Sequence, residues 1–421
     1  MNIAVLSYHT CPLAMLGGKH TGGMNVYVRD LTKYLGRFGV HADVFTRSED
    51  ECVPHVLHDL GCGNRVVHIP AGPETPRPKK ELVDYLDQFT NNVLEFSSKK
   101  GIQYDLIHSH YWMSGITAAE LKKDWGIPMI QMFHTLALLK NPAARKESEL
   151  ETEERVEGEK FVISVSDLIT ASTIDEKEKL VDLYQTPEEK IRIVPPGVDT
   201  SRFYPIPKDE AKEFLGIPND ENMLLFVGRI EPLKGIDTLI RAIAQMRKSD
   251  VMSNCPHYLY IIGGDPNGEK MDMDHEMQRL QELCREQGVG DLILFLGKKD
   301  QDTLQYYYSA AEIVVMPSNY ESFGMVALEA MACGTPVVAT QVGGLQHLVQ
   351  NGITGFTVPH NDPTALEEKL TQLVCHDELR EKMKKNSVKY ARTFSWDVIT
   401  PQIISVYEEL LEEKELNRAK I

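Results

Sequence analysis

Short apolar runs alternate with amphipathic stretches through the first half of the chain. The runs typical of buried strands lie at residues 2–7, 41–46, 65–70, 106–110, 129–133, 168–171 and 191–194. Between them, stretches such as 25–38 and 79–99 repeat their apolar positions at helical spacing. Because this order is typical of consecutive βαβ units, it predicts a parallel sheet with helices on both faces.

The pattern breaks at the Pro-Pro-Gly sequence of residues 195–197 and begins again at residue 223. Strand patterns then lie at residues 223–228, 257–263, 292–296, 313–316, 336–339 and 355–358, with helical patterns between them. At 421 residues the chain is too long for one core. We therefore predict an α/β protein with two Rossmann-like, doubly wound domains, residues 1–198 and 199–395. The apolar spacing of residues 396–421 predicts a last helix that packs back on the first domain.

Composition narrows the classes of partner. The net charge of −17 argues against a nucleic-acid-binding protein, which needs a basic surface to neutralise phosphates. The seven cysteines are scattered without paired CxxC spacing, so no metal site is expected and a reducing cytoplasm is indicated. The first residues are typical of a buried strand rather than of a signal peptide. No apolar run approaches about 18 residues, so no membrane-spanning helix is expected.

Polar clusters follow the predicted strands of the first half, at the edge where parallel sheets bind ligands. Residues 17–25 form a glycine-rich loop that opens a helix; its free amides favour an anion, although a surface loop without a ligand has the same composition. His108-Ser109-His110-Tyr111-Trp112 ends one strand, and His134-Thr135 follows the next. Two such strand ends together favour a site, with a purely structural role for His108 as the alternative.

The second half carries two charged clusters at equivalent places. Arg229 and Lys234 lie five residues apart on a glycine-bounded turn, where a guanidinium fork and an ammonium can together hold a diphosphate. The alternative is a solvated basic turn, which the acidic character of the chain disfavours. Glu321 and Glu329 lie on either side of a predicted helix start, so we expect Glu321 to face a hexose and Glu329 a ribose. The alternative for Glu329 is a helix-surface glutamate, which its apolar neighbours oppose.

The spaced motifs Gly228-Arg229…Lys234-Gly235 and Glu321-Ser322-Phe323-Gly324…Glu329 resemble family 4 of the retaining glycosyltransferases, over nearly the whole chain. The resemblance implies the GT-B fold, in which a sugar leaves a nucleotide diphosphate donor in a cleft between two domains. For a UDP-sugar carrying N-acetylglucosamine or glucose, it implies a donor site of Gly22, Gly23, Arg229, Lys234, Glu321, Gly324 and Glu329. It implies catalytic roles for His134, Arg229, Lys234 and Glu321.

Within the family, the first half most resembles the branch that begins mycothiol synthesis, which glycosylates D-inositol 3-phosphate. The resemblance implies an acceptor site made of His9, Asn25, Lys79, Tyr111, Thr135 and Arg155. Of these, Lys79, Tyr111, Thr135 and Arg155 would hold the phosphate, because cations and hydroxyls suit a dianion. The chain departs from the branch at His20-Thr21, where an acidic residue is usual, and at Val156, where a second arginine is usual.

Sucrose-phosphate synthases, which join UDP-glucose to fructose 6-phosphate, are the alternative within the fold. They share the lysine but usually carry Gly-Gly-Gln where this chain has Gly22-Gly23-Met24. Two alternatives come from other functional classes, because a fold does not fix a function. One is a nucleotide-sugar epimerase, which would act without an acceptor, and the other is an inactive sugar-nucleotide sensor. A homodimer is compatible with the sequence, which leaves the oligomeric state open.

The expected reaction is a retaining transfer in which the donor's own phosphate oxygen accepts the proton of the acceptor hydroxyl. Arg229 and Lys234 would stabilise the negative charge that develops on the departing UDP. For this reason no cofactor is required, and a magnesium ion is compatible with the reaction but not obligatory.

Overall fold

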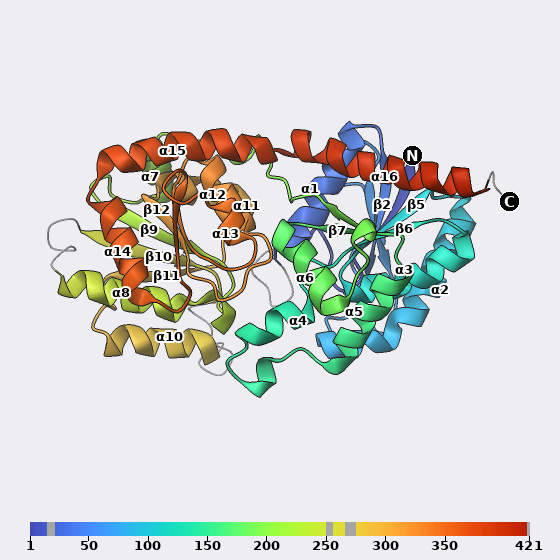
Figure 1. The fold of residues 1–421 in the computed structure, drawn as a ribbon, viewed down its shortest axis with the longest axis horizontal. Helices are drawn as coiled ribbons and strands as arrows, with labels where there is room; N and C mark the ends of the chain where they lie inside the picture. The colour runs from blue at the N-terminus through green and yellow to red at the C-terminus, as the bar shows by residue number, and fades with distance from the viewer. Residues whose placement is uncertain (15–21, 250–255, 266–274, 419–421) are drawn as a thin grey trace. The chain divides into compact units, whose positions relative to one another are not determined.

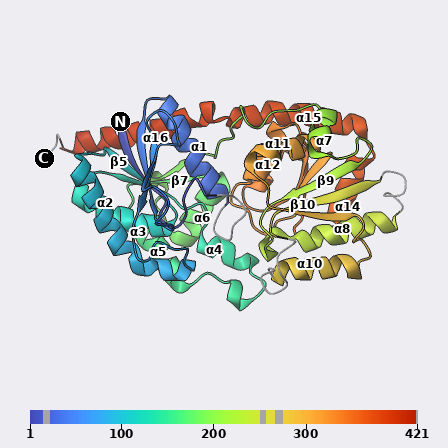
Figure 2. The ribbon, with the colours of Figure 1, turned by 180° about the vertical axis from the view of Figure 1, so that it is seen from behind.

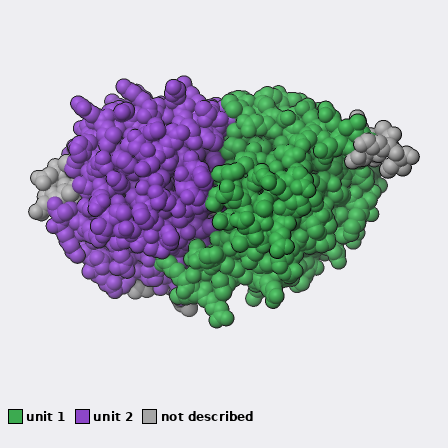
Figure 3. Space-filling view, in the orientation of Figure 1, with its two compact units in different colours: residues 1–14, 23–197, 396–421 green, residues 15–22, 198–395 purple. Residues whose placement is uncertain are grey.

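The chain forms two compact units (Figure 3). Each unit contains one sheet. In the computed structural model, residues 1–14, 22–249, 256–265 and 275–418 are described. Unit 1 contains residues 1–14, 23–197 and 396–421, and unit 2 contains residues 15–22 and 198–395. The chain therefore passes from unit 1 to unit 2 after Gly197 and returns after Ser395, so the last helix belongs to the unit of the first strand.

The sheet of unit 1 has eight strands in the order β3-β4-β2-β1-β5-β6-β7-β8. Their bounds are β1 Asn2–Leu6, β2 His41–Arg47, β3 Val56–Leu57, β4 Arg65–Ile69, β5 Leu106–His110, β6 Met129–Met132, β7 Leu168–Ala171 and β8 Ile191–Ile193. All neighbours pair in parallel except β3, which is antiparallel to β4. The parallel sheet was predicted, but β3 was not among the predicted strands, because a two-residue edge strand is too short to produce an apolar pattern.

Helices cover both faces of the unit 1 sheet (Figures 1 and 2). Their apolar sides form two separate cores. One core includes Phe89, Leu121 and Val162, and the other includes Tyr27 and Trp396. The helices are α1 Gly23–Arg37, α2 Leu86–Lys100, α3 Trp112–Trp125, α4 Ala137–Lys140, α5 Glu153–Val165, α6 Ile174–Tyr184 and α16 Trp396–Arg418. Helix α16 packs beside α1, as its apolar spacing predicts.

Short 3-10 helices connect several of these elements. They are η1 Lys79–Tyr85, η2 Asn141–Ala143, η3 Glu147–Glu149 and η4 Glu188–Lys190 in unit 1, and η5 Pro232–Lys234 and η6 Arg392–Phe394 in unit 2. The stretch predicted as one helix at residues 79–99 is therefore two elements, η1 followed by α2. Lys79 lies at the start of η1, on a tight turn rather than on the longer helix.

Unit 2 contains a six-stranded parallel sheet in the order β11-β10-β9-β12-β13-β14. Its strands are β9 Asn222–Val227, β10 His257–Ile262, β11 Ile293–Gly297, β12 Ile313–Met316, β13 Val337–Thr340 and β14 Gly355–Val358. Its helices are α7 Lys208–Leu215, α8 Ile236–Lys248, α10 His275–Glu286, α11 Gln301–Ala310, α12 Met325–Ala332, α13 Leu345–Leu348, α14 Pro363–Val374 and α15 Asp377–Ala391. Helices α8, α10 and α14 contribute to one core and α11 and α12 to the other.

Each sheet has a switch point beside its first strand. In unit 1 the chain moves outward from β1 to β2 and later returns to β5 on the other side; in unit 2 it moves from β9 to β10 and returns to β12. Loops that leave neighbouring strands in opposite directions open a crevice at the carboxyl edge, where such folds bind ligands. His9 follows β1 and Tyr111 follows β5, while Arg229 follows β9 and Glu321 follows β12. The topology thus places these four predicted site residues at switch points.

Among the described residues, every helix is too short or too polar to cross a bilayer.

Candidate active site

Tyr111 is the centre of a cluster at the switch point of unit 1. Its backbone has φ 75°, a left-handed conformation that is uncommon for a bulky residue and is often found at functional sites. The Lys79 Nζ lies 4.0 Å from the centroid of the Tyr111 ring, and the guanidinium carbon of Arg155 lies 4.9 Å from it. The ring of His9 lies 4.4 Å away, centroid to centroid. Residues from three separate segments therefore converge on the ring of Tyr111.

Arg155 connects this cluster to Thr135, the fourth residue predicted to hold a phosphate. Its Nη2 donates to the Thr135 carbonyl at 2.8 Å and to the Thr135 hydroxyl at 3.0 Å. Its Nε donates to Glu159 at 2.8 Å, and its Nη1 lies 3.0 Å from Glu151. The Arg155 side chain is only 4% exposed. The structure thus brings Lys79, Tyr111, Thr135 and Arg155 together.

The charges of this cluster are set by burial and by close partners. Burial raises the pKa of Tyr111 despite the nearby Arg155, so its hydroxyl stays protonated and can donate a hydrogen bond. Burial opposes the charge of Arg155, but Tyr111, Glu159 and Glu151 together raise its pKa. Burial would raise the pKa of Glu151, yet Arg155 and Lys140 lower it to about 2. The cluster therefore holds permanent cations beside protonated hydroxyls.

Asn25 lies in the first turn of α1 and is buried. Its side-chain amide donates to the Thr10 hydroxyl at 2.6 Å and to the Cys11 carbonyl at 2.7 Å. These bonds hold the loop that follows His9. The glycine-rich loop predicted at residues 17–25 is described only from Gly22 onward, where Gly23 begins α1; residues 17–21 lie outside the described residues.

Three histidines line the ends of β5 and β6. His134 has φ 60°, and its Nε2 lies 3.0 Å from the Nδ1 of His110, so one nitrogen donates to the other. His108 is fully buried, and its Nδ1 lies 2.7 Å from the Tyr407 hydroxyl of α16. Burial lowers the pKa of both His108 and His134 to about 3, so these rings are neutral at ordinary pH. The surroundings of His108 fit the purely structural role that was its alternative in the sequence. Sequence reasoning missed the contact between His110 and His134.

In unit 2, the cations predicted to bind the diphosphate are each paired with a carboxylate. The Lys234 Nζ lies 2.5 Å from the Oε2 of Glu321, and both side chains are less than one fifth exposed. Arg229 pairs with Glu231 at 2.8 Å and is 42% exposed. The ion pair between Lys234 and Glu321 joins the loop after β9 to the loop after β12. Spacing alone did not predict this pair, because the two residues were assigned to different parts of the donor.

Glycines allow the loops of unit 2 to approach Glu321 closely. Gly324 precedes α12 with φ 106°, and a Cβ there would lie 2.5 Å from Leu345. After β13, a Cβ on Gly343 would lie 2.0 Å from the carbonyl oxygen of Glu321, and one on Gly344 would lie 2.4 Å from the Cα of Phe323. Sequence reasoning missed this second loop, although a Gly-Gly pair directly after a parallel strand was the available signal.

Glu329 is buried within α12 rather than lying on a helix surface, so that alternative was wrong. Its Oε2 accepts a hydrogen bond from the Tyr308 hydroxyl at 2.8 Å, and Gln301 lies at 3.5 Å from its other oxygen. Among the described residues, no group of three or more His, Cys, Asp or Glu side chains is arranged to hold a metal ion.

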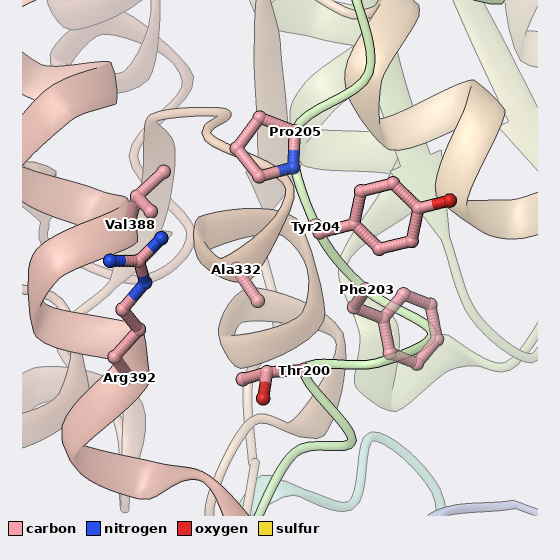
Figure 4. A pocket seen from close by; sticks show the side chains of 7 residues that line it. All are labelled: Thr200, Phe203, Tyr204, Pro205, Ala332, Val388 and Arg392. Atoms are coloured by element: carbon pink, nitrogen blue, oxygen red, sulfur yellow. The ribbon is translucent and has the colours of Figure 1, made fainter.

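A small cavity elsewhere in unit 2 contains none of the predicted site residues (Figure 4). Its volume is about 50 Å³, and it is lined by Thr200, Phe203, Tyr204, Pro205, Ala332, Val388 and Arg392. Pockets for small ligands usually measure about 300–1,000 Å³, so this cavity is too small for a nucleotide sugar.

Two α/β units with charged side chains at the switch point of each parallel sheet, joined in unit 1 by the Tyr111 ring, have the architecture of the GT-B class. A model described as "Glycosyltransferase Family 4" matches residues 21–202, and one described as "Glycosyl transferases group 1" matches residues 207–390. The chain belongs to this family of glycosyltransferases, which confirms the family and the fold that the motifs indicated.

Curated relatives match the chain over almost its whole length. The D-inositol 3-phosphate glycosyltransferase of Actinosynnema mirum is 40% identical over 406 residues, covering 96% of each chain. The protein of the same name from Corynebacterium jeikeium is 38% identical over 413 residues, covering 97% of each chain.

Solved structures show the same architecture. Sucrose-phosphate synthase from Thermosynechococcus elongatus has a TM-score of 0.87 and 33% identity, with 98% of this chain and 99% of that chain covered. Anabaena HepE, solved with UDP and glucose, has a TM-score of 0.74 and 19% identity, with 97% and 100% covered. At that identity, the second match supports the fold alone.

Proposed function

We propose that this glycosyltransferase moves a hexose from a UDP-sugar to D-inositol 3-phosphate with retention of the anomeric configuration. The observation that carries the proposal is the convergence of Lys79, Tyr111, Thr135 and Arg155 at one switch point. Two cations and two hydroxyl donors around one point match the charge and the oxygens of a phosphate monoester. The names of the most similar curated relatives support the same acceptor.

The donor would bind at the switch point of unit 2. Arg229 and Lys234 would face the diphosphate, Glu321 the hexose, and Glu329 the ribose. In this account the donor takes the place of the carboxylates that now pair with the two cations, and Glu321 turns to the sugar hydroxyls. Arg229 lies on the loop after β9 and Lys234 ends η5, so the exchange would be a change of side-chain partners at the carboxyl edge of the sheet.

The transfer itself would need no basic side chain from the protein. A phosphate oxygen of the donor would accept the proton of the attacking hydroxyl while the bond from the sugar to UDP breaks. Arg229 and Lys234 would stabilise the charge that appears on UDP, so a metal ion would not be required. His134 would contribute a neutral ring beside the donor sugar, as its lowered pKa indicates.

Sucrose-phosphate synthesis is the second candidate, because a synthase of that name is similar in structure and 33% identical over nearly the whole chain. The same phosphate cluster would then bind fructose 6-phosphate. The two candidates share a donor class and differ in the ring that carries the acceptor phosphate.

A matrix of donors and acceptors tests both candidates. UDP-N-acetylglucosamine and UDP-glucose would each be incubated with inositol 3-phosphate, fructose 6-phosphate, the unphosphorylated forms of both, and no acceptor. We expect UDP release with D-inositol 3-phosphate and a kcat/KM for free inositol lower by about 100-fold or more, because unmet buried polar groups penalise the smaller acceptor. Equal rates with both inositols would contradict the proposal, and donor interconversion without acceptor would indicate an epimerase. The anomeric configuration of the product, read by NMR, tests retention.

A further inference from the structure

Glu159 is a fully buried carboxylate that sequence reasoning did not single out. It lies on α5, one helical turn after Arg155, and its residue exposure is 0%. A buried carboxylate is costly unless a cation and hydrogen-bond donors satisfy it. Its position beside the acceptor cluster indicates which groups it satisfies.

Three elements of unit 1 donate to this carboxylate. The Nε of Arg155 donates to Oε1 at 2.8 Å, and the backbone amide of Ala137 donates to Oε2 at 3.0 Å. The Tyr184 hydroxyl, at the end of α6, donates to Oε2 as well and accepts from the Leu138 amide at 3.1 Å. Glu159 and Tyr184 together therefore hold the first amides of α4, two residues after Thr135.

We propose that Glu159 is the positioning residue of the acceptor-phosphate site, because it holds both the Arg155 guanidinium and the turn that carries Thr135. This inference rests on the proposed function. Glu159 contacts no reacting atom; it acts through Arg155 and Thr135.

The geometry of Arg155 explains why such a residue is needed. A guanidinium on a long side chain has several rotamers, and only some of them place its plane over the Tyr111 ring. The bond from Nε to Glu159 and the bonds from Nη2 to Thr135 restrain both ends of the guanidinium plane. Because the Arg155 side chain is already restrained, it loses less conformational entropy when the acceptor binds. Acceptor affinity should therefore depend on Glu159, and donor affinity should not.

The variant Glu159→Gln tests the inference in the full-length chain. Glutamine keeps the shape and one acceptor oxygen but removes the charge that faces Arg155. We expect the KM for D-inositol 3-phosphate to rise about 10-fold or more, as for the loss of a charge-assisted hydrogen bond, while the KM for the UDP-sugar changes little. An equal rise of both KM values would mark Glu159 as merely structural and overturn the inference.

Glu176→Gln is the matched control. Glu176 is also a buried glutamate of unit 1, but its carboxylate accepts from the Ser172 amide at 2.7 Å and so caps the first turn of α6. We expect both KM values of this variant to stay near those of the wild type. Tyr184→Phe keeps the Glu159 charge and removes one donor, so it tests the same idea if Glu159→Gln does not fold; its acceptor KM should rise about 2- to 5-fold, and an unchanged value would count against the inference.

A double-mutant cycle shows whether Glu159 acts through Arg155. In an Arg155→Lys background, which lacks the Nε donor of the arginine, Glu159→Gln should raise the acceptor KM much less than it does alone. Full additivity would overturn the inference. The two proposals fail separately: a wild-type chain that turns over no phosphorylated acceptor contradicts the proposed function, whereas normal wild-type turnover with an unchanged Glu159→Gln acceptor KM contradicts only the positioning role.

Discussion

Arg155 in unit 1 and Arg229 in unit 2 are both predicted to bind phosphate groups, but their surroundings differ. Arg155 lies on a helix with a side chain 4% exposed, and its nitrogens face Glu159, Glu151 and Thr135. Arg229 lies on the loop after β9, is 42% exposed and pairs with Glu231, its near neighbour in sequence. Arg155 is held by a network of hydrogen bonds before any ligand binds, whereas Arg229 can change its partner.

The physical consequence follows from solvation. When one partner of a buried ion pair is removed, water does not reach the site to take its place. The remaining charge is therefore left without compensation. An exposed pair contributes little to stability, because water solvates whichever partner remains. In unit 1, therefore, binding and folding should depend on the same side chains, whereas in unit 2 activity should be separable from stability.

The largest expected effect is on stability. Arg155→Ala leaves the Glu159 carboxylate buried without its cation, so the free energy of unfolding should fall by about 3–5 kcal/mol. Arg229→Ala, the matched variant in unit 2, should change it by no more than about 0.5 kcal/mol. Urea unfolding of both variants at pH 7 checks the difference. Similar losses for the two variants would contradict the comparison.

Lys234→Ala should differ from Arg155→Ala in the property that it affects most. We expect a large effect on turnover and a smaller one on the free energy of unfolding. Without the ammonium beside the departing UDP, kcat should fall about 100-fold or more, as when one preorganised electrostatic contact is lost. The free energy of unfolding should fall by about 1–2 kcal/mol, less than for Arg155→Ala, because the Lys234 and Glu321 side chains are 19% and 18% exposed whereas those of Arg155 and Glu159 are 4% and 0% exposed. Initial rates of UDP release measure the effect, with Lys248→Ala, an exposed lysine at the end of α8, as the control. Near-normal turnover of Lys234→Ala would refute its role.

The buried histidines make stability depend on pH. Burial lowers the pKa of His108 in the folded chain from 6.5 to about 3, so below pH 6.5 the unfolded chain binds a proton that the folded chain does not. Stability should therefore fall as the pH drops from 6.5 towards 3, by about 1.4 kcal/mol per pH unit for this group. Unfolding at pH 7 and pH 5 should differ less in His108→Asn than in the wild type. His360→Gln, which changes an exposed histidine, should retain the wild-type difference.

The smallest expected effect concerns Glu151, which pairs with both Arg155 and Lys140 and is 20% exposed. This carboxylate would compete with an incoming phosphate for Arg155, the cation that the two would share. Glu151→Gln should therefore lower the KM for the phosphorylated acceptor, by about 2- to 5-fold, as expected for a partly exposed ion pair of less than about 1 kcal/mol. The direction is opposite to that expected for Glu159→Gln, and a rise in the acceptor KM would show that Glu151 supports the site instead.

Much of the architecture was predictable because buried parallel strands are apolar on both faces. The strands at residues 106–110, 168–171, 313–316 and 355–358 begin and end where the apolar runs do. The site residues were recognisable for a related reason: polar groups directly after such runs lie at the carboxyl edge of the sheet. The two-residue β3 and the change from η1 to α2 were not predictable, because edge pairing and a tight first turn depend on neighbours distant in sequence.

The amino-acid sequence by itself determined that there are two parallel-sheet units and which side chains lie at their ligand-binding edges, because hydrophobic periodicity and motif spacing are local properties. Only the tertiary structure decided the partners of those side chains: Lys234 with Glu321, His110 with His134, and Arg155 with Glu159 beneath the turn of Thr135. The reason is that a charged or polar group takes the partner that chain folding brings within hydrogen-bond distance. That choice depends on loop paths and rotamers, which spacing along the chain does not specify.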